Sequence, residues 1–572
     1  MLFLPRMYKI YDQRHFESVH RAMRSKDLSD CVLSALKVLK ETNNFIKRDV
    51  TVKSTSESLT RKIKGKRAFC AGNYQDALIL YNAALMIAPH DSEAMMLAYY
   101  SRAELLLEMK QFSCCLKDIE TCLTMNCPDD IGDWLQKMKE EACKYTWMEK
   151  NVHDQINSPL SGNFFKFKRG CNTEIPCVSS DVEIIMESQK PKIVAARDIP
   201  VGTVLAIETA FVSASHVMNR CTSCHYCHKM SFNLIPCEGC CHVLFCDKHC
   251  KDQSMQEGHN VECKIINLIL PDVELCVKAV IKMRQMCSSW DELISASNDL
   301  GVDRMKNSSV ADIFGSHKFS LLNSHNDTHF IYGAMFNICM YLANIIHYLD
   351  IKTSFLPNSP EHKSAAIRAI SRIMMHLSLY STPLQIQPCA LATTESKTSL
   401  HNYSNKGYLP FISNLTHSCL PNSYQLGIKN SVVLVALMPI KKGTELTISF
   451  TGHWTEQEHD EKRAHKLLIH YRTVCNNCII CSGEGILHPQ LLSDTQMKAY
   501  QKLVMDNKTM KNLPQRIQSL YLKSCKTLQL LNEAPCSKEY REVFVMFVQC
   551  LIHFIHCQFP NFILNRYVVS NV

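Results

Sequence analysis

A run of cysteines that ends in a histidine and a cysteine has the residue types best suited to chemistry in this chain. It contains four pairs of metal-ligand residues, with two or three residues inside each pair: Cys224 and Cys227, Cys237 and Cys240, Cys246 and Cys250, His259 and Cys263. A close pair places two donors on one turn of the backbone, and two pairs complete the tetrahedral shell of one zinc ion. The eight donors predict two closed, structural zinc sites, in preference to free or disulfide-bonded cysteines.

Two further cysteines adjoin this run. Cys221 precedes Cys224 by three residues, and Cys241 follows Cys240 directly. Each can be an alternative ligand or a spare buried thiol, and we favour the spare thiol. A catalytic zinc site keeps a coordination position open, and nothing in this spacing requires one.

The composition limits the kinds of protein that can carry such sites. The chain has 572 residues, of which 46% are hydrophobic and 20% charged, and this balance and length predict a globular protein of several domains. Thirty cysteines without a recognisable secretory signal indicate a reducing compartment, so we expect the cytoplasm and the nucleus. The net charge of +9 is mild for this length and forms no long basic stripe, so no specific nucleic acid is expected as a partner.

Residues 1–150 are helical by pattern, and about 58–124 have the spacing of two tetratricopeptide-like repeats. In the first repeat, small residues and tyrosines fall at the typical offsets: Gly65, Ala68, Gly72, Tyr74, Ala77, Tyr81, Ala84 and Pro89. Two repeats are few for a stable array, so we expect flanking helices near 28–44 and 130–145 to support them. An unrelated helical hairpin is the alternative, and the implied function is a docking surface.

Short β-rich runs lie on both sides of a long helical stretch. Strands are predicted before the cysteine run, at 182–186, 192–196 and 204–212, and again between 385 and 450. Residues 264 to about 381 are mostly helical, and the tail from 492 onward is helical again.

One apolar segment, residues 543–564, has a composition close to that of a membrane span. It contains glutamines, histidines, a proline and an asparagine, which a membrane span tolerates poorly. We therefore predict a buried helix and no membrane contact.

Motifs in the second half resemble those of the SET-and-MYND methyltransferase family. Three segments carry the resemblance: SNLTHSCLPN at 413–422, GTELTISF at 443–450, and the cysteines Cys475, Cys478 and Cys481. They are similar to the family motifs L-N-H-S-C-x-P-N, G-E-E-L-T-I-S-Y and the post-SET C-x-C-x2-C, the last with one more residue in its first gap. Together with the repeats and Gly452-His453-Trp454, they make the chain most similar to the family's fourth, repeat-bearing member group.

This resemblance implies an α+β multidomain organisation, in which a β-rich split SET domain is interrupted by a MYND zinc finger and a helical insert. The implied regions are a helical region 1–150, SET first part 180–223, MYND finger 224–263, helical insert 264–381, SET second part 382–451, post-SET cysteine cluster 452–485 and helical C-terminal region 486–572.

The resemblance also implies ligand sets and a cofactor. In the family the two finger ions are bound alternately, so one would take Cys224, Cys227, Cys246 and Cys250, and the other Cys237, Cys240, His259 and Cys263. A third zinc would be held by Cys419, Cys475, Cys478 and Cys481. The cofactor would be S-adenosylmethionine, and the reaction would transfer its methyl to a lysine amine of a protein, mainly through orientation and electrostatic complementarity.

The chain departs from the family at most positions that contact the cofactor. Lys190 and Pro191 replace a glycine turn, so the backbone can no longer approach the cofactor as closely. Cys389 stands in place of a cofactor-contacting asparagine. Thr416 replaces the asparagine of the N-H-S-C motif and lacks an amide that donates and accepts simultaneously.

Phe450 stands where the family has its catalytic tyrosine, bracketed by Gly443–Leu446 and Gly452–Trp454. It keeps the ring but has no hydroxyl to orient the amine or the methyl group. His417 keeps the family residue, and by resemblance its backbone meets the cofactor, although a general base is a second interpretation.

Two functions therefore compete. One is a protein-lysine methyltransferase, with catalysis impaired by these substitutions. The other is an inactive scaffold that recruits protein partners through the finger and the helical repeats. A zinc-dependent nucleic-acid binder is a remote third, and the sequence does not reveal the oligomeric state.

Overall fold

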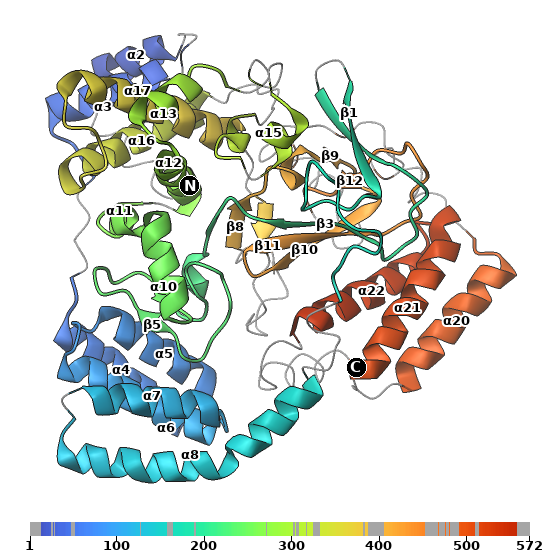
Figure 1. Cartoon of the computed structure of the whole chain (residues 1–572), viewed down its shortest axis with the longest axis horizontal. Coiled ribbons are helices and arrows are strands. Elements are labelled where there is room, and N and C mark those ends of the chain that lie inside the picture. The colour runs from blue at the N-terminus through green and yellow to red at the C-terminus, as the bar shows by residue number, and fades with distance from the viewer. Residues whose placement is uncertain are drawn as a thin grey trace.

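The computed structural model describes most of the chain (Figure 1). The described residues are 13–23, 27, 29–46, 52–125, 127–156, 164–187, 190–269, 271–300, 304, 308–315, 317–323, 332–380, 384–386, 405–451, 467, 475, 480, 491–509 and 514–556. Helices form the two ends and the middle of the described part of the chain, and short strands lie between them.

The predicted helical N-terminal region is confirmed, and its helices form a stacked array. Each helix packs on the next one: α4 (Thr55–Cys70), α5 (Tyr74–Ile87), α6 (Glu93–Glu108), α7 (Phe112–Thr124) and α8 (Asp129–Ile156). Gly65 lets α4 and α5 approach closely, because a Cβ atom there would lie 2.6 Å from the ring of Tyr81. The small residues predicted from the repeat spacing therefore have a packing role.

The first two described helices belong to a different core. α2 (Gln13–Ala22) and α3 (Ser29–Thr42) bury Val19, Cys31 and Leu39 against the helical insert. Arg372 of the insert donates to Asp27 at 2.6 Å, just before α3. The prediction that residues near 28–44 support the repeats is wrong, because an apolar helix face does not specify which core it joins. α8 does pack on α7 as predicted.

The insert supplies the largest hydrophobic core of the described structure. Its helices are α12 (Pro271–Met286), α13 (Trp290–Ala296), α15 (Val310–Phe314), α16 (Tyr332–Lys352) and α17 (Pro360–Tyr380). In the sequence, these helices lie between the cysteine run and the later strands (Figure 1).

Strands from before and after the insert pair with each other. β3 (Val204–Thr209) pairs antiparallel with β11 (Ser431–Ala436), which pairs with β10 (Ser423–Ile428). A second antiparallel sheet is formed in the same way by β4 (Val212–Ala214), β8 (Asn405–Tyr408) and β7 (Leu384–Ile386). β1 (Val182–Glu187) and β2 (Lys190–Ala195) form a separate hairpin.

Both faces of β11 are buried, which explains its unbroken apolar sequence. Successive side chains of a strand point to opposite faces. Leu434 and Ala436 pack into the core between the strands, whereas Val433 and Val435 pack against the C-terminal helices.

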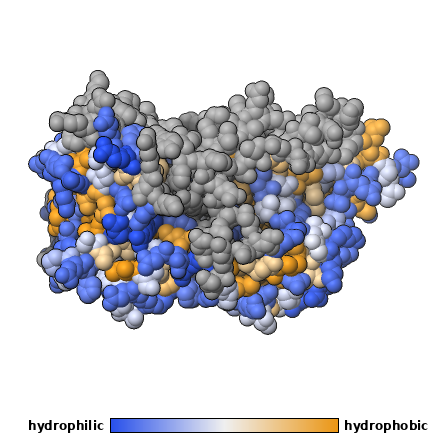
Figure 2. All heavy atoms as spheres, turned by 90° about the horizontal axis from the view of Figure 1, so that it is seen from above, coloured by the Kyte–Doolittle hydropathy of each residue, from blue (hydrophilic) through white to orange (hydrophobic). Residues whose placement is uncertain are grey.

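The C-terminal helices are α20 (Asp494–Thr509), α21 (Pro514–Leu530) and α22 (Lys538–His556). Val543, Phe547 and Leu551 of α22 are fully buried at 0% exposure, so the described part of the apolar segment is a buried helix, as predicted. Within the described chain, no helix combines the length and the apolar character needed to cross a membrane. On the face seen in Figure 2, hydrophobic residues form separate groups among hydrophilic ones.

Candidate metal centres and cofactor positions

Residues 221–263, which we call the finger, fold around a short hairpin and a short helix. β5 (Ile235–Pro236) pairs antiparallel with β6 (Leu244–Phe245). Cys237 therefore lies at the closed end of this hairpin and Cys246 at its open end. Ligand pairs that adjoin the two ends of one hairpin cannot share an ion, which gives a physical reason for alternate pairing.

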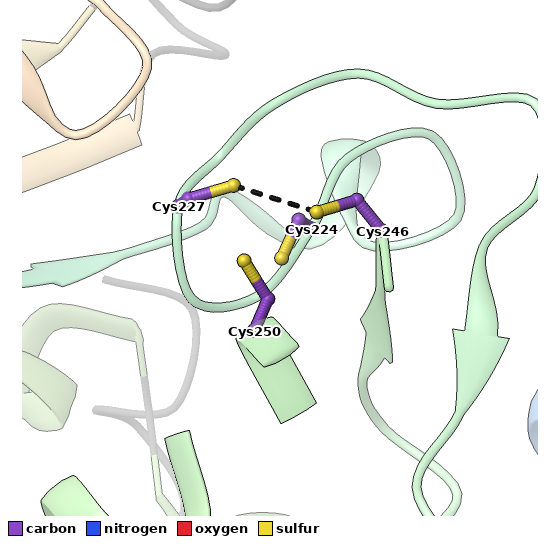
Figure 3. A group of neighbouring side chains, drawn as sticks. All are labelled: Cys224, Cys227, Cys246 and Cys250. Atoms are coloured by element: carbon purple, nitrogen blue, oxygen red, sulfur yellow. Dashed lines mark hydrogen bonds between the residues drawn. The ribbon is translucent and has the colours of Figure 1, made fainter. Parts of the chain in front are cut away.

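The first donor set surrounds a common point (Figure 3). The Sγ atoms of Cys224, Cys227, Cys246 and Cys250 all lie within 4.8 Å of one another. Asp247 caps α10 (Lys248–Ser254) by accepting a 2.7 Å hydrogen bond from the Cys250 N–H, which fixes the first turn of that helix. Hydrogen bonds from Cys227, Cys246 and Cys250 lower the pKa of Cys224, so the site favours a thiolate.

The second set contains Cys237, Cys240, His259 and Cys263, whose ligand atoms also lie within 4.8 Å of one another. The Nε2 atom of His259 faces Cys240 Sγ at 3.8 Å. Its Nδ1 atom lies 2.8 Å from a carboxylate oxygen of Glu262. A carboxylate on one ring nitrogen fixes the tautomer that leaves the other nitrogen free to bind a metal.

Both sets fit zinc. Two sulfurs bound to one tetrahedral zinc at about 2.3 Å should lie about 3.8 Å apart. The Sγ atoms of Cys227 and Cys246 are 3.7 Å apart, and so are those of Cys237 and Cys263. The structure thus brings the predicted donors together in the two predicted sets, and neither Cys221 nor Cys241 belongs to either one.

A buried charge network lies behind the second set. Glu262 accepts from His259 and also lies 3.1 Å from Nε2 of His225. Lys278 of α12 lies 3.2 Å from that same nitrogen and 3.7 Å from Glu262. Burial alone would raise the pKa of Glu262, but the charge of Lys278 and the neighbouring His225 hold it well below its usual range.

This network extends into the insert. Lys278 lies 3.3 Å from Glu274 on the same helix, and Arg220 pairs with Glu274 at 2.9 Å. His225, His259 and Glu262 also form a group of possible metal ligands. Because the Lys278 ammonium already supplies a positive charge there, we assign no metal to that group.

Lys53 reaches the second set from the other side. Its Nζ donates to the backbone oxygen of Cys237 at 2.6 Å and to that of Met86 at 3.0 Å. Burial lowers the pKa of Lys53, whereas the sulfurs of Cys241 and Cys237 oppose this change. A zinc bound by three thiolates and one neutral histidine has a net charge of about −1, and Lys53 lies where it offsets that charge.

A third, incomplete group lies near the later strands. His417, Cys419 and Cys475 place their ligand atoms within 4.8 Å of one another, whereas Cys478 and Cys481 lie outside the described residues. The Phe450 N–H donates to Nδ1 of His417 at 3.1 Å, so neutral His417 carries its proton on Nε2, which lies 3.3 Å from Cys419 Sγ. His417 is therefore a hydrogen-bond partner of Cys419 in this geometry, and not a metal ligand.

Two of the predicted cofactor positions, Thr416 and His417, lie on one of two short parallel strands. β9 (Thr416–His417) pairs with β12 (Thr447–Ile448). The adjoining Leu446 N–H donates to the Ile193 carbonyl of β2 at 2.8 Å, which connects this pair to the strand that begins at Lys190. Thr416 is exposed, and its hydroxyl donates to Glu445. Cys389 lies outside the described residues.

Phe450 lies directly beside His417. Their ring centroids are 5.1 Å apart with an interplanar angle of 42°. The Phe450 side chain is half-buried and packs against two hydrophobic clusters, one of which contains Cys419. The ring is thus held in place by packing alone, without a polar group of its own.

Comparison with known proteins shows what these features are similar to. A SET domain model matches residues 192–451. This chain contains a SET domain. It is 23% identical to human (Homo sapiens) protein-lysine N-methyltransferase SMYD4 over 547 residues, which cover 76% of this chain and 68% of the human protein. The Mus musculus SMYD4 is 23% identical over 583 residues (81% and 72%), and that of Gallus gallus is 22% identical over 447 residues (66% and 59%).

The chain is therefore related to the SMYD4 group of SET and MYND domain-containing proteins. The match covers 68% of the human protein and 66% of the Pongo abelii SMYD4, to which the chain is also 23% identical, so the chain spans about two thirds of the length of these relatives. The matched SET region begins within β2 and includes the later strands together with the finger and the helical insert between them.

Glu208 of β3 fixes the backbone that leads into this SET motif. Its two carboxylate oxygens accept from the N–H groups of Phe411 and Ile412 at 2.8 and 2.9 Å. Burial raises the pKa of Glu208 to about 8, although both backbone donors act to lower it. The anchored turn lies immediately before β9, so Glu208 positions Thr416 and His417 through the backbone.

Sequence reasoning missed the supporting residues of the finger. Glu262 could have been found, because it lies three residues after the ligand His259, where both face the same side of a helical turn. Lys53 and Lys278 lie far from the finger in sequence, and no local pattern marks them. Glu208 likewise has no motif around it.

Proposed function

We propose that this chain is a SET-and-MYND protein built as an S-adenosylmethionine-dependent protein-lysine methyltransferase with weakened catalysis. In this proposal, residues 224–263 are a MYND finger that holds two zinc ions, and the SET domain is split around the finger and the insert. The helices between 58 and 124 would be tetratricopeptide repeats, and the protein would act in the cytoplasm and the nucleus.

One observation carries the proposal. The Phe450 N–H binds His417 Nδ1 at 3.1 Å, so the position of the family tyrosine adjoins the motif histidine. This juxtaposition supports a methyl-transfer site at β9 and β12, bounded by the strand that begins at Lys190. S-adenosylmethionine, when bound, would supply an electrophilic methyl group there.

The side chains at this position predict slow turnover. Removing one oriented hydrogen-bonding group from a reacting centre typically costs about 10²–10³ in rate. Phe450 has no hydroxyl, and the Thr416 hydroxyl is directed to Glu445. The chain would still orient a lysine amine by packing, but neither Phe450 nor Thr416 offers a free polar group to stabilise the transition state.

Restoring the missing groups tests this proposal. Zinc-loaded wild type and the Thr416→Asn/Phe450→Tyr variant are incubated with methyl-tritiated S-adenosylmethionine and a lysine-containing peptide array. We expect the double variant to transfer methyl groups about 10²–10³ times faster than wild type. Phe450→Leu is the matched control and should give no gain.

A second candidate is a scaffold without methyl transfer. The complete donor sets of the finger favour this scaffold. Residues around these donors support zinc binding, whereas Phe450 and Thr416 do not provide the polar groups of the family at the methyl-transfer position. In the same experiment, transfer at background level in both wild type and the double variant would favour the scaffold. Transfer by wild type at a rate that the double variant does not exceed would contradict the claim of weakened catalysis.

A further inference from the structure

The helical array α4–α8 is attached to the molecule through the finger. Side chains on both sides make polar contacts across this joint: Lys53 with Cys237, Asn82 with Cys221, His90 with Glu238, Arg102 with Leu234, and Asn233 with Cys114 and Asp118. All of the finger residues in these contacts fall within 221–238. In Figure 1, the array lies directly beneath β5 and α10.

Three consecutive finger residues make the central contacts. Phe232 packs against both hydrophobic clusters of the array. Asn233 donates from Nδ2 to the Cys114 carbonyl at 2.8 Å and to Asp118 Oδ1 at 2.9 Å. The Leu234 side chain is 0% exposed, and its carbonyl accepts from Arg102 at 2.8 Å. An aromatic ring, a carboxamide and a backbone carbonyl of three consecutive residues each have their own partner on the helical array.

Arg102 is the anchor of this recognition. Its guanidinium is 0% exposed and makes a two-fold contact with Asp118, at 2.7 and 2.8 Å. One remaining nitrogen, Nη1, donates to both Asn82 Oδ1 and the Leu234 carbonyl. A buried guanidinium is stable only when its donors are satisfied, so Arg102 requires an acceptor at the position of the Leu234 oxygen.

We propose that the face formed by α5, α6 and α7 is a binding site for an extended peptide with an aromatic–asparagine–aliphatic pattern. Phe232, Asn233 and Leu234 occupy this site in cis. A partner protein that carries such a segment competes with the finger for it. This inference does not depend on the proposed methyl transfer.

The resident segment is held near the site by the second metal set, because Cys237 follows Leu234 by three residues. Tethering of this kind gives an effective concentration in the millimolar range, so a free peptide competes poorly. Removing the resident side chains from the site should therefore let a free peptide bind with the affinity that the site itself provides.

The test uses full-length, zinc-loaded protein and a fluorescein-labelled peptide of residues 229–236, KMSFNLIP. Fluorescence polarisation compares wild type with the Phe232→Ala/Asn233→Ala variant. We expect the vacated variant to bind the peptide at least roughly tenfold tighter than wild type. Adding Arg102→Met to that variant should abolish binding, and a peptide with alanine in place of asparagine should bind weakly.

Lys229→Ala is the matched control, since Lys229 is exposed and lies in the same loop. It should behave as wild type. Equal binding by wild type and the vacated variant, or no binding by either, would overturn the proposal if zinc content and circular dichroism are unchanged.

A second measurement uses only the wild-type protein, so its result does not depend on whether a variant folds. Millimolar unlabelled peptide is added to wild type, and amide hydrogen exchange is followed by mass spectrometry. Faster exchange in residues 231–236, with α6 and α7 still protected, is expected. Unchanged exchange in residues 231–236 would contradict displacement.

Discussion

The finger and the strand pair β9–β12 differ in what surrounds their key residues. In the finger, all eight predicted donors converge, and Asp247, Glu262, Lys53 and Lys278 hold or neutralise them. At the strand pair, backbone pairing and packing are complete, but Phe450 and Thr416 offer little to a reacting centre. Metal ligands contribute to folding itself, whereas a catalytic hydroxyl contributes almost nothing to it. A chain can therefore lose a catalytic hydroxyl while keeping its fold.

Among the tests of this difference between the finger and the strand pair, zinc removal should have the largest effect on folding. Structural zinc contributes about 10–16 kcal/mol to small zinc domains, so chelation should unfold the finger and detach the helical array. Hydrogen exchange should then rise in residues 221–263 and in α5–α7, while β3, β10 and β11 stay protected. Metal analysis before chelation should give close to three zinc ions per chain, and two ions would mean that the group at Cys419 binds none.

Lys278→Met tests whether the charge network supports the finger. It leaves Glu262 buried without this cation, whereas Glu274 keeps its pair with Arg220, and breaking a buried pair in this way costs about 3–5 kcal/mol. Lys282→Met is the control, since Lys282 lies one turn later and pairs with the partly exposed Glu257; a pair of this kind contributes at most about 1 kcal/mol. Thermal unfolding should separate the two variants clearly, and equal melting temperatures would show that the network does not matter.

Glu208 allows a similar test in the SET domain, namely whether its carboxyl group contributes to stability. Its pKa is raised to about 8 in the folded state, so between the unfolded value near 4.5 and about 8 the folded protein binds the extra proton. Its contribution to stability is therefore present at low pH and lost as the pH rises towards 8. The melting temperature of wild type should fall relative to that of Glu208→Gln between pH 6.5 and 8, then level off. A parallel pH dependence for both proteins would refute the role of this carboxyl group.

Phe450→Tyr should have the smallest effect on folding. The ring is half-buried and held by packing, and the new hydroxyl adds no apolar contact, so we expect a change in stability within about 0.5 kcal/mol. Differential scanning fluorimetry compares it with Phe450→Ala, which should cost about 3–5 kcal/mol if the ring packs as described. A large destabilisation by tyrosine would mean that Phe450 fills a site too tight for the family residue.

The sequence predicted short-range features well. The four donor pairs follow from their spacing of two or three residues, whereas their assignment to two ions followed from the family resemblance. Strands β1, β2 and β3 follow from their β-rich runs. Long-range partners were not predictable, because nothing near Arg102 indicates that it binds the Leu234 carbonyl. The docking of α3 on the insert was missed for the same reason. β2 and β9 lie on the same segment only through the pairing of residues 444–448, which no local motif specifies.

The most direct test of this account is titration calorimetry of S-adenosylmethionine into purified, zinc-loaded full-length protein. The substitutions at Lys190, Pro191, Cys389 and Thr416 predict weak binding, with no saturation at micromolar cofactor. Tight binding of one cofactor per chain would contradict the claim that the cofactor site is weakened while the finger keeps its complete donor sets.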